Sequence, residues 1–156
     1  MEHMRKTAFI VTATLILLIS LVWIILTPTL FPTRQAESRL AAPHPGFTAP
    51  PFTLQTPDGR SLSLADYSGK PVLIFFWASW CFVCKSTMPG LQQVYEDDES
   101  GQFEILAVNA TSQDNLTNAI TYFQSQKYTF PMLLDQDGEL AGTYQLRALP
   151  TAILVG

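Results

Sequence analysis

The sequence predicts an α/β sandwich over residues 50–156, preceded by one transmembrane helix. Apolar runs of strand length alternate with segments of helical periodicity, in the order strand, helix, strand, helix and two strands, which is typical of sheets with right-handed parallel crossovers. The run Val72–Trp77 is apolar throughout, as expected for a strand covered on both faces. The only two cysteines of the chain, Cys81 and Cys84, follow it closely. The fold is therefore expected to present a cysteine pair where a buried strand meets a helix.

Residues 8–26 form an apolar segment of 19 residues without a charge, 13 of them Leu, Ile, Val or Phe. At about 1.5 Å per residue, such a helix is long enough to cross the core of a bilayer. The alternative is a cleaved signal peptide, whose apolar region is usually about 7 to 15 residues long. Arg5 and Lys6 flank the segment directly, which favours a cytoplasmic N-terminus at residues 1–7. We expect a single-pass protein of the cell membrane with its domain on the extracytoplasmic face.

Residues 27–49 are expected to be a proline-rich linker, extended and semi-rigid. The domain that follows is long enough for one modest core. From Phe52 onward it has five basic and eleven acidic residues, a net charge of −6. Because nucleic acid binds basic surfaces, this charge argues against a nucleic-acid partner.

The first predicted elements are a hairpin and a helix. Phe52–Leu54 and Ser61–Leu64 flank the turn residues Pro57, Asp58 and Gly59, which indicates two paired strands. A helix is expected from about Phe82, with a kink at Pro89. Its apolar face is expected to consist of Met88, Leu91, Val94 and Tyr95.

The remaining elements complete the alternation. Phe103–Asn109 is predicted to be a strand, and a second helix is indicated by the helical spacing of Leu116, Ala119, Ile120 and Phe123. Thr111 and Asp114 are placed like a capping box before that helix. Two short strands are expected at Pro131–Leu134 and Thr151–Val155, separated by a turn at residues 135–138 and a short helix near Leu140–Tyr144.

The spacing of Cys81 and Cys84 places both on one face of a helix, at a separation that a disulfide can bridge. Such a bond closes a ring of only four residues and would stabilise the fold by about 2 kcal/mol in the loop-entropy description. A bond that stabilises so little is better suited to being made and broken.

Several stretches of the chain together carry a resemblance to a known family. They are Phe76-Trp77-Ala78-Ser79-Trp80-Cys81-Phe82-Val83-Cys84, Met88-Pro89, Leu149-Pro150-Thr151, and residues 49–54 and 61–64. With these stretches the chain resembles the membrane-anchored, thioredoxin-like thiol-disulfide oxidoreductases of the TlpA/ResA type. The resemblance spans nearly all of residues 50–155, including the N-terminal hairpin of that family, and it implies a thioredoxin-like sandwich with this extra hairpin.

The expected chemistry follows from the position of the motif. At a helix N-terminus, Cys81 faces unpaired N–H groups and the positive end of the helix dipole, which lower the pKa of a thiol. Cys81 is then the nucleophile, and Cys84, one turn further on, resolves the mixed disulfide. We expect Trp80 to shape the surface around the sulfur, and the apolar pair Phe82-Val83 to contact partners.

The family resemblance also implies that Pro150 is in the cis form and packs against the two sulfurs, with Leu149 presenting its backbone to an incoming peptide. By base rate alone, an X-Pro bond is trans in about nineteen of twenty cases, so this expectation rests on the resemblance.

Two departures from the family concern proton handling. Thioredoxin has a buried aspartate where this chain has Phe75, and ResA-like members often carry a glutamate where it has Thr87. The proton of Cys84 would then pass to water or to Lys85. The redox potential and the direction of the reaction are left open by the sequence.

The leading functional hypothesis is a membrane-tethered oxidoreductase that reduces protein disulfides, first those of apocytochrome c during cytochrome c maturation. General thiol reduction, without a preference for apocytochrome c, is the second candidate. The alternatives are a peroxiredoxin-like peroxidase and a non-catalytic membrane-tethered binding module. Expected partners are cysteine-containing extracytoplasmic proteins and a membrane thiol donor, and the chain is expected to be a monomer.

No cofactor or metal is expected. Lys85 stands where a haem-attachment motif needs histidine, and the only histidines, His3 and His44, lie outside the domain. Asp135 and Asp137 are expected to form a turn rather than a calcium loop. The family normally continues past Val155 with another strand and a closing helix, so we expect the chain to be a C-terminally truncated domain.

Overall fold

The structure is a computed structural model that describes residues 14–20, 22–23 and 48–156. Residues 14–20 and 22–23 are helical. No helix among the described residues combines the length and the apolar character needed to cross a membrane. The predicted N-terminus at 1–7, half of the predicted anchor at 8–26 and nearly all of the linker at 27–49 lie outside the described residues.

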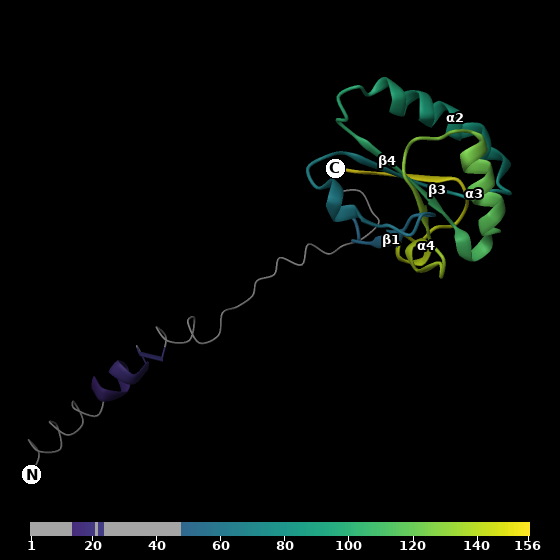
Figure 1. Ribbon diagram of the computed structural model, residues 1–156. Helices are drawn as coiled ribbons and strands as arrows, with labels where there is room; N and C mark the ends of the chain where they lie inside the picture. The colour runs from purple at the N-terminus through teal and green to yellow at the C-terminus, as the bar shows by residue number, and fades with distance from the viewer. Residues whose placement is uncertain (1–13, 21, 24–47) are drawn as a thin grey trace, which may run out of the picture. The chain divides into compact units, whose positions relative to one another are not determined.

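One mixed sheet of six strands organises the second unit, residues 39–156 (Figure 1). The strand order is β2-β1-β5-β4-β3-β6. β3 pairs in parallel with β4, and β4 in parallel with β5, while β6 and the β1–β2 hairpin pair antiparallel. The strands are β1 (Thr53–Gln55), β2 (Ser61–Ser63), β3 (Val72–Trp77), β4 (Glu104–Asn109), β5 (Met132–Leu134) and β6 (Thr151–Val155).

The helices lie between these strands in the predicted order. α2 spans Phe82–Asp97, α3 spans Leu116–Ser125 and the short α4 spans Glu139–Thr143. Two 3₁₀ turns, η1 at Leu64–Tyr67 and η2 at Thr111–Gln113, complete the unit. β3 and β6 have the predicted bounds, and α2 begins at the predicted residue. The α/β architecture with parallel crossovers between β3, β4 and β5 is confirmed.

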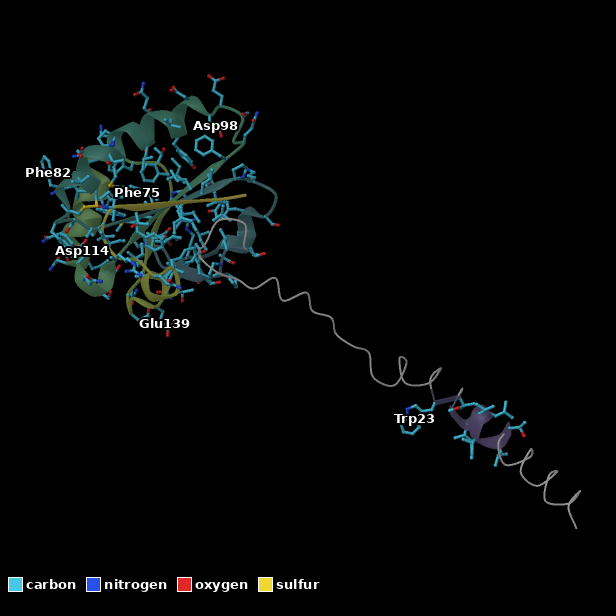
Figure 2. The ribbon with its side chains drawn as sticks, turned by 180° about the vertical axis from the view of Figure 1, so that it is seen from behind. Trp23, Phe75, Phe82, Asp98, Asp114 and Glu139 are labelled. Atoms are coloured by element: carbon cyan, nitrogen blue, oxygen red, sulfur yellow. A yellow bond between two sulfur atoms is a disulfide. The ribbon has the colours of Figure 1, made fainter. Side chains whose placement is uncertain are left out.

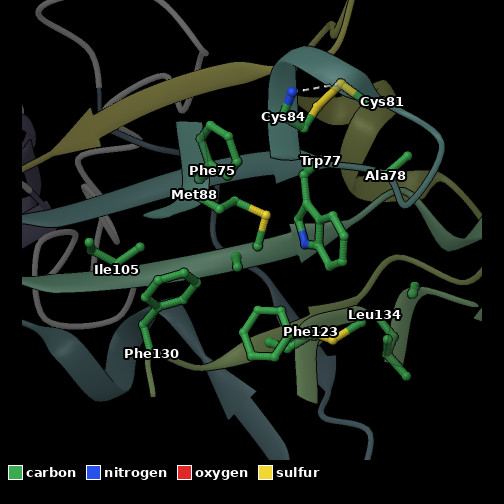
Figure 3. Packing of buried hydrophobic residues seen from close by; sticks show 13 residues of the cluster. Phe75, Trp77, Ala78, Cys81, Cys84, Met88, Ile105, Phe123, Phe130 and Leu134 are labelled. Atoms are coloured by element: carbon green, nitrogen blue, oxygen red, sulfur yellow. Dashed lines mark hydrogen bonds between the residues drawn. A yellow bond between two sulfur atoms is a disulfide. The ribbon is translucent and has the colours of Figure 1, made fainter. Parts of the chain in front are cut away.

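The sheet is covered by a separate apolar cluster on each face. Alternate residues of β3 supply the two clusters: Phe75 and Trp77 on the face of α2 and α3, Ile74 and Phe76 on the face of α4. Figure 3 shows the first cluster, in which Met88 and Cys84 of α2 and its N-cap residue Cys81 pack beside these rings. β3 is therefore buried from both sides, as its unbroken apolar sequence predicts.

α2 differs from its predicted apolar face. Met88 is fully buried, but the Val94 side chain is 55% exposed, so its assignment to the core is wrong. Gln92 is buried instead, because its amide donates to Thr129 Oγ1 at 2.8 Å and its carbonyl accepts the Thr129 N–H at 2.9 Å. A polar residue can occupy a core position when a distant loop forms hydrogen bonds with its side chain.

α2 continues through Pro89 as far as Asp97. Proline has no N–H to offer the carbonyl four residues earlier, which here belongs to Lys85. The Tyr122 hydroxyl of α3 donates to that carbonyl at 3.4 Å. A neighbouring helix thus supplies a donor that Pro89 lacks.

The predicted capping box before α3 is also wrong. The N-cap of α3 is Asn115, whose side-chain oxygen accepts the Asn118 N–H at 3.0 Å. Thr111 begins the turn η2, and its hydroxyl donates to Asn109. The Asp114 carboxylate accepts the backbone N–H and the hydroxyl of Ser79, 35 positions earlier, and these long-range donors occupy the group that a local pattern assigns to the helix end.

Tyr144 makes the stability of the fold depend on pH in the alkaline range. Its hydroxyl donates to the Pro50 carbonyl at 2.7 Å, and burial raises the pKa of Tyr144 to about 12. An unfolded tyrosine has a pKa of about 10. Because the folded pKa is the higher one, this contribution to stability is complete below pH 10 and is lost as the pH rises toward 12.

We expect Tyr144→Phe to lose less stability than the wild type between pH 9 and pH 11.5, as measured by urea unfolding at both pH values. Tyr95, whose pKa is also raised to about 12 by burial, leaves a residual dependence in the variant. An identical loss in both proteins would contradict the assignment.

Candidate functional site

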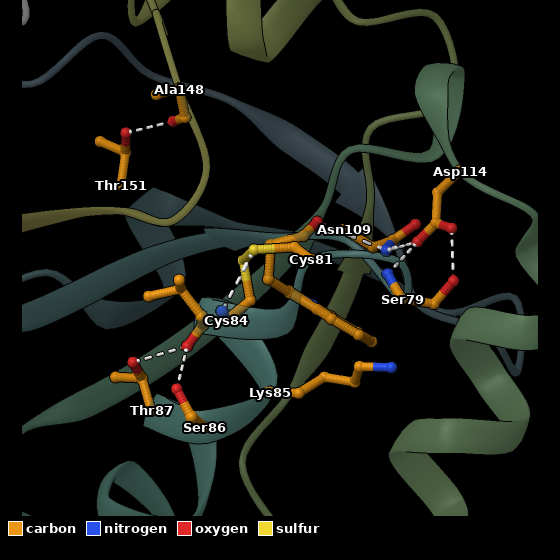
Figure 4. The surroundings of a disulfide bond; sticks show 12 residues. Ser79, Cys81, Cys84, Lys85, Ser86, Thr87, Asn109, Asp114, Ala148 and Thr151 are labelled. Atoms are coloured by element: carbon orange, nitrogen blue, oxygen red, sulfur yellow. Dashed lines mark hydrogen bonds between the residues drawn. A yellow bond between two sulfur atoms is a disulfide. The ribbon is translucent and has the colours of Figure 1, made fainter.

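Cys81 and Cys84 are joined by a disulfide at the start of α2, with their Cα atoms 5.2 Å apart (Figure 4). Cys81 is the N-cap residue of α2, and its sulfur accepts the Cys84 N–H at 3.1 Å. The Cys81 side chain is 5% exposed, whereas that of Cys84 is fully buried. The predicted pairing and the predicted position at a helix N-terminus are confirmed, and Cys81 is the more accessible of the two.

The residues around the disulfide form an exposed apolar surface. Trp80 is 60% exposed, Phe82 81% and Val83 56%. The Trp80 indole N–H donates to the Gln113 carbonyl at 2.9 Å, which fixes one edge of the ring. Single exposed apolar residues are common on protein surfaces, whereas contiguous exposed apolar patches mark interaction sites. We refer to Trp80, Phe82 and Val83 as the apolar rim.

The Leu149–Pro150 peptide bond, just before β6, is cis, as the family resemblance implies. Leu149 is partly buried and packs against the clusters on both faces of the sheet, one of which contains the two cysteines. The Thr151 hydroxyl donates to the Ala148 carbonyl at 2.7 Å, across the cis bond. The contact between Pro150 and the sulfurs stays a prediction.

A polar network beside the motif was missed by sequence reasoning. The Asp114 carboxylate accepts the backbone N–H of Ser79 at 2.6 Å and its hydroxyl at 2.5 Å. The Asn109 amide donates to the same carboxylate at 2.8 Å. One signal could have suggested it: Asn109 pairs with Trp77 at the carboxyl ends of two parallel strands, which meet at the same edge of the sheet.

The sequence profile of the AhpC/TSA family matches residues 45–156. The chain belongs to the AhpC/TSA family.

Several relatives of this AhpC/TSA chain are named thiol-disulfide oxidoreductases. Thiol-disulfide oxidoreductase ResA of Geobacillus thermodenitrificans is 33% identical over 152 residues, which cover 97% of this chain and 84% of the relative. ResA of Bacillus subtilis is 29% identical, with 97% and 80% covered. The crystal structure of StoA from Bacillus subtilis superposes with a TM-score of 0.60 and 30% identity, over 73% of this chain and 81% of StoA. The thioredoxin-like fold and the predicted enzyme class, thiol-disulfide oxidoreductase, are confirmed.

In this AhpC/TSA chain, the two positions that depart from thioredoxin and ResA carry no carboxylate. Phe75 is 2% exposed and belongs to the apolar cluster on the α2 face. The Thr87 hydroxyl is exposed and donates within α2 to the Val83 carbonyl at 2.9 Å. The Lys85 amine lies 5.3 Å from the centroid of the Tyr122 ring, in cation–π contact. Its proposed part in taking the Cys84 proton stays a prediction.

Within the described residues, no cluster of three or more His, Cys, Asp or Glu side chains could hold a metal ion. Asp135 and Asp137, which sequence analysis assigned to a turn, accept backbone N–H groups at the start of α4. These carboxylates therefore act as helix caps.

Proposed function

We propose that this oxidoreductase is tethered to the cell membrane and reduces disulfides of extracytoplasmic proteins, with the haem-binding cysteines of apocytochrome c as the first candidate substrate. The observation that carries the proposal is the hydrogen bond from the Cys84 N–H to the Cys81 sulfur at the start of α2. This donor and the helix dipole both stabilise negative charge on that sulfur, so Cys81 is the group suited to attack.

In the proposed reaction, the Cys81 thiolate attacks one sulfur of the substrate disulfide. A bond forms between Cys81 and that sulfur, the substrate disulfide breaks, and its second sulfur leaves as a thiolate that takes a proton. Cys84 then loses its proton and attacks Cys81, which forms the Cys81–Cys84 disulfide and releases the first substrate sulfur. The substrate gains two electrons, the dithiol loses two, and a membrane thiol donor restores the dithiol.

The apolar segment 8–26 supports the membrane location, since its length and lack of charge are typical of an anchor. The two cysteines are the only ones in the chain, so the protein has no other thiol that could mispair in an oxidising compartment. The exposed apolar rim favours a polypeptide substrate over a small disulfide, because a small disulfide cannot cover three large side chains.

The test uses the reduced full chain and three oxidants. They are a peptide whose disulfide joins two cysteines that are separated by two residues and followed directly by histidine, the same peptide without the histidine, and hydrogen peroxide. We expect rapid reduction of the first peptide. Equal rates on the two peptides would indicate general thiol reduction, and faster consumption of peroxide would indicate a peroxidase. Failure to react with any of the three would favour a binding module.

Phe82 tests the rim directly, because 81% of its side chain is exposed beside the nucleophile. We expect Phe82→Ser to reduce the rate with the disulfide peptide about fivefold, which corresponds to losing roughly 1 kcal/mol of apolar burial in the complex. The rate with oxidised glutathione should be unchanged.

A matched control is Val94→Ser, which removes an exposed apolar side chain from the last turn of the same helix. We expect no change in either rate for this variant. A loss with Val94→Ser equal to that with Phe82→Ser would mean that general surface polarity, and not the rim, controls the rate.

A further inference from the structure

We propose that Asp114 is a positioning residue for disulfide exchange: it fixes the turn Ala78–Cys81, so that the Cys81 sulfur stays at the N-terminus of α2. The inference rests on the proposed role of Cys81 as the nucleophile. Asp114 lies 35 positions from Ser79 in the sequence, and its carboxylate connects the β4–α3 junction to the turn that carries the motif.

The Asp114 carboxylate is fully engaged by hydrogen-bond donors. Both of its oxygens accept from Ser79, one from the backbone N–H at 2.6 Å and the other from the hydroxyl at 2.5 Å. The same oxygens accept the Asn109 amide and the Asn115 N–H, each at 2.8 Å. A carboxylate with four donors has one favourable orientation, and it transmits that orientation to Ser79.

Figure 4 shows Asp114 and Asn109 beside Ser79, and residues between these two also bind the segment before Cys81. The Trp80 indole donates to the Gln113 carbonyl at 2.9 Å, and the Ala110 N–H donates to the Trp77 carbonyl at 2.9 Å. Residues 109–114 therefore bind three successive parts of the chain segment that precedes Cys81: the end of β3, Ser79 and Trp80. Asp114 supplies the only side chain among these contacts that binds both the backbone and the side chain of a turn residue.

The position of Cys81 depends on this turn. The Cys81 N–H donates to the Ala78 carbonyl at 3.1 Å, and the Cys81 sulfur accepts the Cys84 N–H at the same distance. If the turn is released, Cys81 can rotate away from the N-cap position, and the reduced sulfur then loses the donor that stabilises its thiolate. Nucleophilic attack would also begin from a wider range of orientations.

In Asp114→Asn, the loss of positioning and the loss of negative charge are expected to shift the pH profile of disulfide exchange in opposite directions. Removing a negative charge near Cys81 would by itself favour the thiolate and shift the pH profile of exchange to lower pH. The amide instead replaces one acceptor oxygen by an NH2 donor, which faces either the Ser79 N–H and the Asn109 amide or the Ser79 hydroxyl and the Asn115 N–H. In both orientations the side chain loses at least one N–H donor that the carboxylate accepts, which loosens its hold on the turn. We expect a rate about tenfold lower with the disulfide peptide and a profile shifted to higher pH. The Asp114→Asn variant keeps Lys85, the charged residue next to the motif on α2.

Ser79→Ala tests the same contact without changing any charge, and it removes only one hydroxyl. We expect a smaller shift in the same direction, because the Ser79 backbone N–H still reaches Asp114. The two effects should be less than additive in the double variant, since both act on one contact. This variant keeps the test informative if Asp114→Asn fails to fold.

Asp98→Asn is the matched control. The Asp98 carboxylate also accepts one backbone N–H, from Phe103 at 3.1 Å, and one serine hydroxyl, from Ser100 at 2.8 Å. Asp98 follows the last residue of α2, at the opposite end of the helix from Phe82 (Figure 2). The same change in charge therefore occurs away from the motif. We expect a wild-type rate and a wild-type pH profile.

The inference is overturned if Asp114→Asn, folded by circular dichroism, exchanges at the wild-type rate, or if its pH profile moves to lower pH. It is also overturned if Asp98→Asn shows the same defect. Loss of the proposed function has a different signature, because the wild-type chain itself would then fail to react with the disulfide peptide.

Discussion

Cys81→Ser is expected to reduce disulfide exchange to the uncatalysed background. A serine hydroxyl does not ionise near neutral pH, and it cannot form the mixed disulfide through which exchange proceeds. The remaining thiol cannot substitute for it, because Cys84, in the first turn of α2, is fully buried. The measurement is the rate of release of free thiols from the disulfide peptide, followed with a thiol reagent.

Cys84→Ser is the informative counterpart. Its Cys81 still attacks, but no second thiol resolves the product, so the protein should accumulate as a one-to-one mixed disulfide with the peptide. Mass spectrometry without reductant detects this adduct directly. Exchange that survives in Cys81→Ser, or a mixed disulfide that forms on Cys84 in that variant while Cys84→Ser forms no adduct, would reverse the assigned roles.

Asp135→Ala is expected to lower the free energy of unfolding by about 2–4 kcal/mol, because two N–H groups at a buried helix start lose a charged acceptor. Asp135 is fully buried, and its two carboxylate oxygens accept the Leu140 N–H at 3.1 Å and the Ala141 N–H at 2.9 Å. The loss is large compared with the 5–15 kcal/mol that stabilises a typical domain. Urea unfolding followed by circular dichroism measures it.

The matched control is Asp137→Ala in the same turn. Asp137 is exposed and accepts a single N–H, that of Glu139, at 3.0 Å. Water can replace this bond, so the change in unfolding free energy should stay below about 1 kcal/mol. Equal effects of the two substitutions would show that the burial of Asp135 adds nothing to its role as a cap.

The parts of the fold that sequence reasoning predicted correctly are those set by local patterns. The unbroken apolar run of β3 indicates a strand buried on both faces, and the cysteine spacing indicates a pair on one turn of α2. The cis bond before Pro150 came from the family resemblance, because no local pattern distinguishes it from a trans bond.

The errors arise where a distant partner determines the role of a residue. Gln92 occupies the core position because it binds Thr129, and Val94 is left exposed. Asp114 has the spacing of a helix cap, yet it binds Ser79 on another element. Neither partner is visible in a window of one helix. Polar residues at the ends of adjacent parallel strands are therefore worth testing as pairs before they are assigned to local caps.

The central claim is that Cys81 and Cys84 form a dithiol that cycles reversibly between its reduced and oxidised states. Equilibration of the full chain in glutathione and dithiothreitol buffers, with alkylation of free thiols and mass spectrometry, measures its reduction potential. We expect a single two-electron transition toward the negative end of the range from about −300 to −120 mV, as suits a reductant of protein disulfides. A potential near −120 mV would make the protein an oxidant, and a pair that shows no transition in this range would contradict a redox function altogether.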